Sequence, residues 1–151
     1  MSFQDILNNL KQSAGELKVE ALKYRHKDFM RACMSGSALI ALADGAVSAE
    51  EKQKMLRFIE NFDALSVFSS KEMLECFQNY ATLLELDKDL GEAKTYDAIR
   101  KMSADDQPSR LVLRLIIAIA GADGNFDDQE KYVAKKIAQE LKIDPAEFEL
   151  A

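Results

Sequence analysis

The sequence predicts an all-α protein, a pseudo-twofold bundle of about seven to eight helices built on two helix–turn–helix repeats. Proline occurs only at positions 108 and 145, and there are only six glycines in 151 residues. No stretch alternates apolar and polar side chains in the manner of a strand. Apolar residues make up 48% of the chain, enough for a sizeable core. We therefore expect a single helical domain over residues 1–151.

The first two helical regions are predicted by their apolar spacing. Residues 3–23 form an amphipathic segment, which we expect to be interrupted near Gly15. Its apolar side predicts packing on the core, with a membrane surface as the alternative. Residues 26–43 form the second region. The side chains expected to point inward there are Phe29, Met30, Cys33, Ala38, Leu39 and Leu42.

Serine residues predict where the next two helices begin. Ser48 and Glu51 have the spacing of a capping box, which predicts a helix over residues 48–61. Ser69 or Ser70 opens a following helix, and Gly91 is expected to end it or to start a shorter one. The apolar side chains at helical spacing in that helix are Met73, Leu74, Phe77, Tyr80, Ala81 and Leu84.

The last third of the chain contains the most apolar helix. Residues 107–121 are apolar almost all round, which predicts the buried centre of the bundle. Asp106 is expected to cap this helix, with Pro108 in its first turn. Asp127 opens the next helix, which runs to about Leu141, and a short turn follows at residues 144–148.

One phrase is written twice in the sequence. A shift of 79 residues places positions 40–52 on positions 119–131, and seven of these thirteen pairs are identical. Each copy reads as a helix, a tight Asp-Gly turn and a second helix, so that the internal repeat covers about 39–60 and 118–139. Two such hairpins predict a bundle with a pseudo-twofold axis.

The repeated aspartates are not explained by turn formation. Asp44 and Asp123 lie in the last turn of a helix, where a negative charge costs roughly 0.3–1 kcal/mol. Other carboxylates crowd around them, namely Glu50, Glu51, Asp127, Asp128 and Glu130. A bound cation would relieve the repulsion. So would neutralisation by Lys52 and Lys131, or solvation of an exposed loop.

The ligand chemistry indicates which cation to expect. The candidate ligands are all oxygens, which suit Ca²⁺, Mg²⁺ or Mn²⁺ and do not suit structural zinc. The phrase resembles the rear half of an EF-hand loop, but the first acidic ligand positions are occupied by Ile40 and Leu42, or by Ile119 and Gly121. One turn alone is therefore short of ligands, whereas both turns together supply enough. The predicted metal ligands are Asp44, Glu51, Asp123, Asp127 and Glu130.

Charge and motifs exclude several classes of function. The net charge of −6 argues against nucleic acid as a partner. The first residues lack the pattern of a signal peptide, and the apolar run at 111–122 is too short to span a bilayer. Cys33 and Cys76 read as reduced thiols, as expected for a cytoplasmic protein. No catalytic motif is found, so we do not expect an enzyme.

Four phrases carry a resemblance to a known family. They are "MSF" at the start, "EEKQKM" after the first turn, "DGNFDD-E-K" at the second turn and the closing "DPAEF-L". With them the chain resembles the TerB family of tellurite-resistance proteins over essentially its whole length. The resemblance implies an all-helical pseudosymmetric fold and a metal site at shared acidic positions. In this sequence those positions are Asp44 and Glu51, then Asp123 and Glu130, with Gly45 and Gly124 as turn residues and Ser48 and Asp127 as caps.

The resemblance also implies a role in tellurite resistance and stress response. Family members are thought to act with a TerC-type membrane protein and with TerD-type domains at the inner face of the membrane. Ala49 stands where the second copy has Asp128, so the first copy is poorer in acid. Because tellurite is an oxyanion, acidic turns on a chain of charge −6 are not expected to chelate it directly. We expect a cation-binding sensor or adaptor, with a metal-free interaction module as the alternative.

Overall fold

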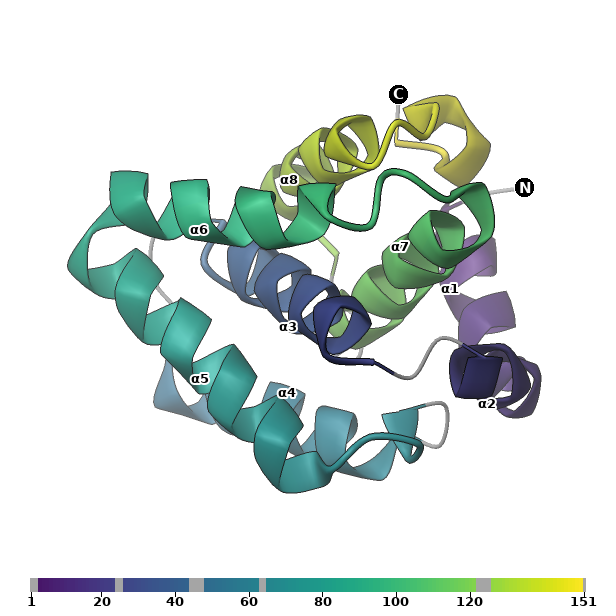
Figure 1. Cartoon of the computed structure of the whole chain (residues 1–151), viewed down its shortest axis with the longest axis horizontal. Coiled ribbons are helices and arrows are strands. Elements are labelled where there is room, and N and C mark those ends of the chain that lie inside the picture. The colour runs from purple at the N-terminus through teal and green to yellow at the C-terminus, as the bar shows by residue number, and fades with distance from the viewer. Residues whose placement is uncertain (1–2, 24–25, 44–47, 63–64, 122–125, 151) are drawn as a thin grey trace.

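The computed structural model describes residues 3–23, 26–43, 48–62, 65–121 and 126–150, without the side chains of 3–4, 11, 14, 20–23 and 51. These residues form eight α-helices, a C-terminal 3-10 helix and no strand, which confirms the all-α prediction (Figure 1). The elements are α1 (Phe3–Gln12), α2 (Ala14–Lys23), α3 (Lys27–Ala41), α4 (Ala49–Asn61), α5 (Ser70–Leu86), α6 (Lys88–Arg100), α7 (Asp106–Ala120), α8 (Asp128–Glu140) and η2 (Pro145–Phe148).

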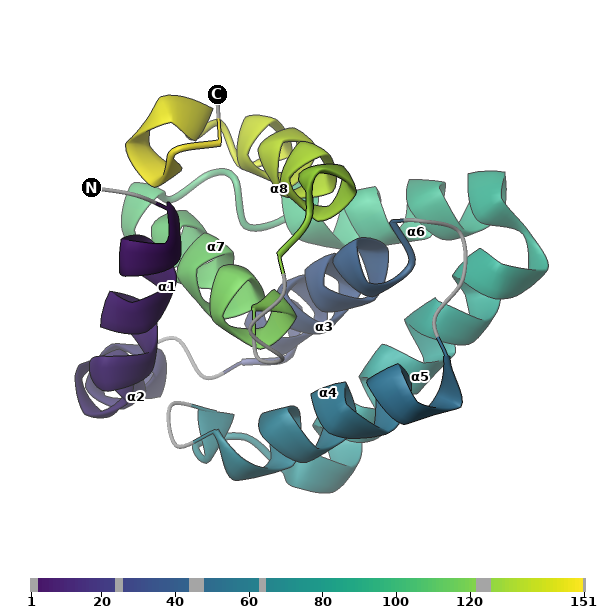
Figure 2. The same ribbon diagram turned by 180° about the vertical axis from the view of Figure 1, so that it is seen from behind.

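Two helices form the centre of the molecule. Helix α3 packs against α5, α6, α7 and α8, and α7 packs against α1, α2, α3, α4 and α8 (Figures 1 and 2). They cross closely at Gly36, where a Cβ atom would lie only 2.3 Å from Cδ1 of Ile116. The predicted burial of α7 is confirmed. Its buried residues are Pro108, Ser109, Leu111, Val112, Leu113, Leu115, Ile116, Ile117, Ala118, Ile119 and Ala120.

The predicted inward side chains are confirmed with small differences in depth. In α3 five of the six are buried and Leu42, just past its end, is half-buried. In α5, Leu74 and Tyr80 are half-buried, and the other four are buried. Ser69 is the N-cap of α5, because its Oγ accepts a hydrogen bond from the Glu72 N–H at 3.3 Å.

The N-terminal segment forms two helices that separate at Ser13, two residues before the predicted break at Gly15. Leu7, Leu10 and Leu17 are buried, and both helices pack on α7. Packing on the core, the first of the two predicted alternatives for this segment, is therefore confirmed.

The predicted role of Gly91 at a helix boundary is wrong. The boundary is Asp87, which is at once the C-cap of α5 and the N-cap of α6. Its side chain accepts a hydrogen bond from the Leu90 N–H at 3.2 Å. Gly91 lies inside α6, where a Cβ atom would be 2.7 Å from Cα of Leu84. The glycine permits close packing of two helices rather than a turn.

The predicted start of α7 is one residue too late. Asp105 takes the N-cap position, although its side chain makes no capping hydrogen bond. Asp106 is the first residue of the helix and pairs instead with Arg110, one turn further on. The predicted capping box of Ser48 and Glu51 depends on a side chain outside the described residues, but α4 does begin directly after Ser48.

The element bounds repeat at the spacing of the sequence repeat. Both α3 and α7 have 15 residues, both α4 and α8 have 13, and each pair is offset by 79 positions. Helix α4 packs on α7 and α8 packs on α3, which is the reciprocal pairing that a twofold relation requires. The twofold relation itself stays a prediction.

Candidate functional site

The structure describes only some of the five predicted metal ligands. Asp44 and Asp123 lie outside the described residues, and Glu51 belongs to α4 but its side chain is not described. Asp127 and Glu130 are described completely, and both lie at the start of α8. Of the predicted site, the structure therefore brings together one pair of residues, both from the second copy of the repeat.

Asp127 and Glu130 form the capping box predicted from the sequence. The Glu130 N–H donates to Oδ1 of Asp127 at 2.8 Å, and the Asp127 N–H donates to Oε1 of Glu130 at 3.3 Å. Each carboxylate thus accepts a backbone N–H at the positive end of a helix dipole, which stabilises negative charge. Both carboxylates have a structural role, and both supply the hard oxygen atoms that a divalent cation prefers.

The described residues contain no group of three or more histidine, cysteine or acidic side chains placed to hold a metal ion. Two carboxylates are fewer than a hard cation needs, since Ca²⁺ takes six to eight oxygen ligands. The metal site therefore stays a prediction whose remaining ligands are Asp44, Glu51 and Asp123.

A cavity of about 540 Å³ is lined by residues from both copies of the repeat. Ala43, which directly precedes Asp44, lines it together with Asp128, which directly follows Asp127. The end of the first copy's leading helix thus meets the start of the second copy's following helix. The complete lining is Leu39, Leu42, Ala43, Leu84, Glu85, Lys88, Glu92, Tyr96, Asp128, Gln129, Tyr132, Val133 and Lys136.

Sequence reasoning missed this cavity. Its walls come from α3, α5, α6 and α8, so that no local pattern in the sequence indicates it. Lys136 lies over the ring of Tyr132, with Nζ 4.7 Å from the ring centroid. Burial and the nearby carboxylate of Glu92 raise the pKa of Tyr96 to about 12. The cavity is therefore lined by apolar, aromatic and charged groups together.

Lys52, one of the cations considered for neutralising the first turn, has a partner elsewhere. Its Nζ lies 3.5 Å from Oε1 of Glu85, at the end of α5. This ion pair links the first turns of α4 to the end of α5.

The cysteines are free thiols, as predicted. Cys33 is buried and Cys76 is half-buried. Burial raises the pKa of Cys76 to about 11 and raises that of Cys33 further. The thiolate is the nucleophilic form of cysteine, so that both residues are poorly reactive at neutral pH.

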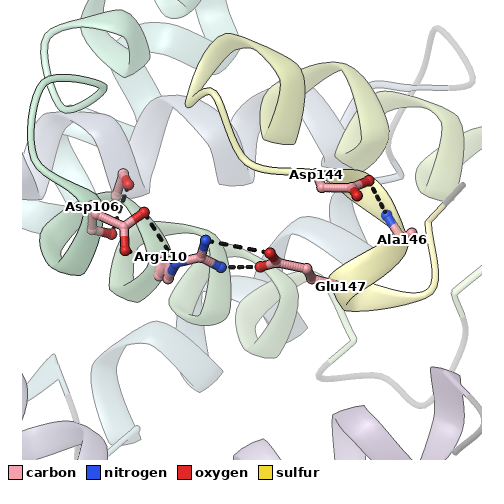
Figure 3. Close-up of polar contacts among 6 residues, drawn as sticks. Asp106, Arg110, Asp144, Ala146 and Glu147 are labelled. Carbon is pink, nitrogen blue, oxygen red and sulfur yellow. Dashed lines mark hydrogen bonds and ion pairs between the residues drawn. The ribbon is translucent and has the colours of Figure 1, made fainter.

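A second polar cluster joins α7 to the C-terminal segment (Figure 3). Arg110 Nε lies 3.1 Å from Oδ2 of Asp106, and its guanidinium also pairs with both carboxylate oxygens of Glu147. Asp144 caps η2, because its Oδ1 accepts a hydrogen bond from the Ala146 N–H at 3.0 Å. The four-residue spacing of Asp106 and Arg110 is visible in the sequence, whereas the contact with Glu147 is not.

Within the described ranges, each helix is too short or too polar to cross a membrane.

Comparison with known proteins places the chain in a family. Residues 30–151 match the family described as TerB, "Tellurite resistance protein TerB". The "Tellurium resistance protein TerB" of Alcaligenes sp is 33% identical over 116 residues, which cover 76% of this chain and 95% of that protein. No solved structure gives a significant match. Because the family match covers most of the chain, from the first turn of α3 through α8, this protein belongs to the TerB family of tellurite-resistance proteins.

Proposed function

We propose that this protein contributes to tellurite resistance without catalysis, by binding a divalent cation at its two acidic turns and signalling this to membrane-associated Ter proteins. The observation that carries the proposal is the duplicated acidic turn. In a TerB-family chain, the same phrase stands between two pairs of helices whose bounds repeat at an offset of 79 residues. The bound ion would be Ca²⁺, Mg²⁺ or Mn²⁺.

The described geometry supports a cation near the second turn. The capping box already fixes the carboxylates of Asp127 and Glu130 in the first turn of α8. A cation bound there would act on residues that also fix the start of α8. Asp128, the first residue of α8, lines the 540 Å³ cavity together with Ala43 of the first copy. Occupation of the turns could therefore be transmitted to a partner at this cavity.

Direct chemistry on tellurite is less well supported. The chain carries a net charge of −6, which disfavours an oxyanion as ligand. The pKa of each cysteine is raised by burial, so that few thiolates are available at neutral pH to reduce tellurite. We therefore propose an adaptor for TerC-type membrane proteins and TerD-type domains, located in the cytoplasm and held peripherally at the membrane through these partners.

Calorimetric titration tests the cation. The metal-stripped protein is titrated with Ca²⁺, Mg²⁺ and Mn²⁺, next to the variant Asp44→Asn/Asp123→Asn. We expect binding heat from the parent and at least tenfold weaker binding by the variant. The control is Glu60→Gln/Glu75→Gln, which removes two exposed charges from α4 and α5 and should bind like the parent. No heat from the parent, or equal affinity in all three proteins, would refute the cation proposal.

Association with partners is tested separately. Tagged protein is used to recover a TerC-type membrane protein and a TerD-type domain, with and without chelator. We expect recovery that depends on the divalent cation and is lost in Asp44→Asn/Asp123→Asn. In the same cells, the variant should fail to restore growth on tellurite. Recovery unaffected by chelator would leave the adaptor role and contradict its control by the cation.

A metal-free interaction module is the second candidate. It is favoured by the capping box of Asp127 and Glu130, which gives two of the acidic residues a structural role without any ion. The melting temperature discriminates between the two. A ligand present at 100 times its Kd stabilises the folded state by about 2.7 kcal/mol. A melting temperature that does not change with added Ca²⁺, Mg²⁺ or Mn²⁺ would favour the metal-free module.

A further inference from the structure

The cavity of about 540 Å³ is bordered by α6 and α8, which pack on each other, and we call it the α6/α8 cleft. Each of the two helices contributes residues spaced four apart, which places them on one face of the helix. They are Lys88, Glu92 and Tyr96 from α6, and Asp128, Tyr132 and Lys136 from α8. One turn further along both helices, the Arg100 guanidinium meets the Glu140 carboxylate at 3.2 Å. This ion pair joins the two helices beyond the cleft.

Burial divides the lining of the α6/α8 cleft into a mouth and an interior. The charged side chains at the mouth are exposed, namely Glu85, Lys88, Asp128 and Lys136. Glu92 and Tyr96 are half-buried. They share the interior with an apolar wall, which consists of Leu39, Leu42, Leu84 and Val133. Among the described residues of the lining, Glu92 is thus the one charged side chain that is partly withdrawn from water.

The carboxylate of Glu92 has no positive partner within the part of the chain that the structure describes. Its charge acts on Tyr96 instead, since burial and the nearby Glu92 carboxylate raise the pKa of this tyrosine to about 12. A carboxylate that is partly withdrawn from water without a cation is unfavourable. A positive charge in the interior of the cleft would therefore be stabilised.

Lys136 shows which kind of cation the cleft accepts. Its Nζ lies 4.7 Å from the ring centroid of Tyr132, within the range of a cation–π contact. A primary ammonium on an aliphatic chain is thus already seated on one of the two aromatic rings that line the cleft. Lys136 occupies the position that a ligand of the same chemistry would take.

We propose that the α6/α8 cleft binds an aliphatic ammonium compound, with its cationic head between Glu92, Tyr96 and Tyr132 and its hydrocarbon part on the apolar wall. The ligand displaces the Lys136 ammonium from Tyr132. The cleft has the size of a small-molecule site, for which roughly 300–1,000 Å³ is usual. The net charge of −6 also favours a cationic ligand. This inference does not depend on divalent-cation binding at the acidic turns.

Calorimetric titration in the presence of chelator tests the ligand class separately from the metal proposal. Two sources supply an aliphatic ammonium, and the probes are 1,5-diaminopentane for a free diamine and Nα-acetyl-lysine amide for a lysine side chain. The uncharged control is 1-pentanol. We expect one amine or both to bind with a Kd below about 1 mM, and 1-pentanol not to bind. The tighter of the two amines identifies the source. No heat from either amine, or equal binding of 1-pentanol, would overturn the proposal.

The variant Glu92→Gln tests the seat of the cationic head. We expect it to bind the amine about tenfold more weakly than the parent, because a charged hydrogen-bond acceptor is lost. The control Asp97→Asn removes an exposed carboxylate from the same helix, outside the lining, and should bind like the parent. Circular dichroism checks that both variants fold. Equal affinities of the two variants would show that the amine binds through general charge attraction, and the proposal would fall.

The variant Lys136→Met tests displacement independently, since it should strengthen binding. Removal of the internal ammonium frees Tyr132 for the ligand, and we expect affinity to rise about two- to fivefold, as an exposed cation–π contact implies. The control Lys94→Met removes an exposed lysine of α6 that does not line the cleft. Its affinity for the amine should stay close to that of the parent. The same affinity in Lys136→Met and Lys94→Met would contradict the proposed position of the ligand on Tyr132.

Discussion

Gly91 shows how a single side chain sets the distance between two helices. A Cβ atom at this position would lie 2.7 Å from Cα of Leu84, and a backbone atom cannot rotate away. In Gly91→Ala we expect the steric clash to cost about 1–3 kcal/mol of stability. The higher helix propensity of alanine offsets about 1 kcal/mol of this cost.

Gly15 is the matched control for this prediction. It lies in α2, and a Cβ atom there would meet nothing within 4 Å. Gly15→Ala should be neutral or stabilising by up to about 1 kcal/mol. Urea denaturation of both variants measures the difference. If Gly91→Ala is as stable as Gly15→Ala, the close crossing of α5 and α6 is wrong.

The two buried thiols make the free energy of unfolding depend on pH in the alkaline range. Burial raises the pKa of Cys76 from 9.0 to about 11 and raises that of Cys33 further. Between pH 9 and pH 11 the folded state therefore holds more protons than the unfolded chain. Stability falls with rising pH wherever this holds. We expect the free energy of unfolding to decrease across this window.

The contribution of one thiol can be isolated. In Cys76→Ser the decrease between pH 9 and pH 11 should be shallower than in the parent, because one titrating group is removed. Cys33 and Tyr96 remain in the variant, and Tyr96, whose pKa is raised from 10.0 to about 12, contributes only above about pH 10, so that a part of the decrease persists. Urea midpoints measured across this range give the slopes. Identical slopes in parent and variant would contradict the burial of the Cys76 thiol.

The start of α8 depends on one carboxylate. Oδ1 of Asp127 accepts the Glu130 N–H at 2.8 Å, so Asp127→Ala should destabilise the protein by about 0.5–2 kcal/mol. Asp127→Asn keeps an acceptor oxygen and should remain close to the parent. Equilibrium unfolding in urea measures both. Equal losses in the two variants would mean that the carboxylate's charge, and not the cap, matters.

The pair of variants also separates two roles of Asp127. Because Asp127→Asn preserves the cap while removing the charge, any loss of cation affinity in it reports on ligation alone. Asp127→Ala removes both functions. A comparison of the two in the calorimetric titration therefore distinguishes a ligand from a residue that only holds α8 in place.

Helix boundaries could be predicted where the signal is local. Ser69 and Asp127 were expected as caps and are caps, because a capping hydrogen bond spans only three residues. The boundary at Asp87 is not predicted, because the sequence favours Gly91 as the boundary instead. In a single sequence, a glycine that ends a helix is not distinguished from one that lets another helix approach. That distinction depends on Leu84, seven residues earlier and on another helix.

Helix α7 connects most parts of the molecule. It packs on α1, α2, α3, α4 and α8, and the side chain of Leu113 is fully buried in its middle. We expect Leu113→Ala to destabilise the protein by about 2–5 kcal/mol, through lost burial and the cavity that remains. The control Val19→Ala, at a side chain 59% exposed, should change stability by less than about 0.5 kcal/mol. Thermal unfolding measures both. Similar melting temperatures would contradict the central position of α7.

The fold was more predictable than the site. Apolar spacing and capping residues together indicated most of the helices, because a helix buries one side of itself and its first turn needs a cap. The sequence repeat predicted two similar helix pairs, and the observed helices of the two pairs have equal lengths. The cavity lined by Tyr96 and Tyr132 could not be predicted, since its walls come from four helices whose mutual angles the sequence does not contain. The metal ligands Asp44 and Asp123 remain a sequence-based prediction.

Asp87 has a consequence for how related chains can differ in length. Helices α5 and α6 share this single residue, whose backbone N–H donates to Leu83 O at 2.9 Å while its side chain accepts from the Leu90 N–H. One inserted residue would rotate α6 by about 100° about its axis. Gly91 would then turn away from Leu84, and a larger side chain would meet α5 in its place. Insertions and deletions among relatives should therefore avoid this corner and accumulate in the other connections of the bundle.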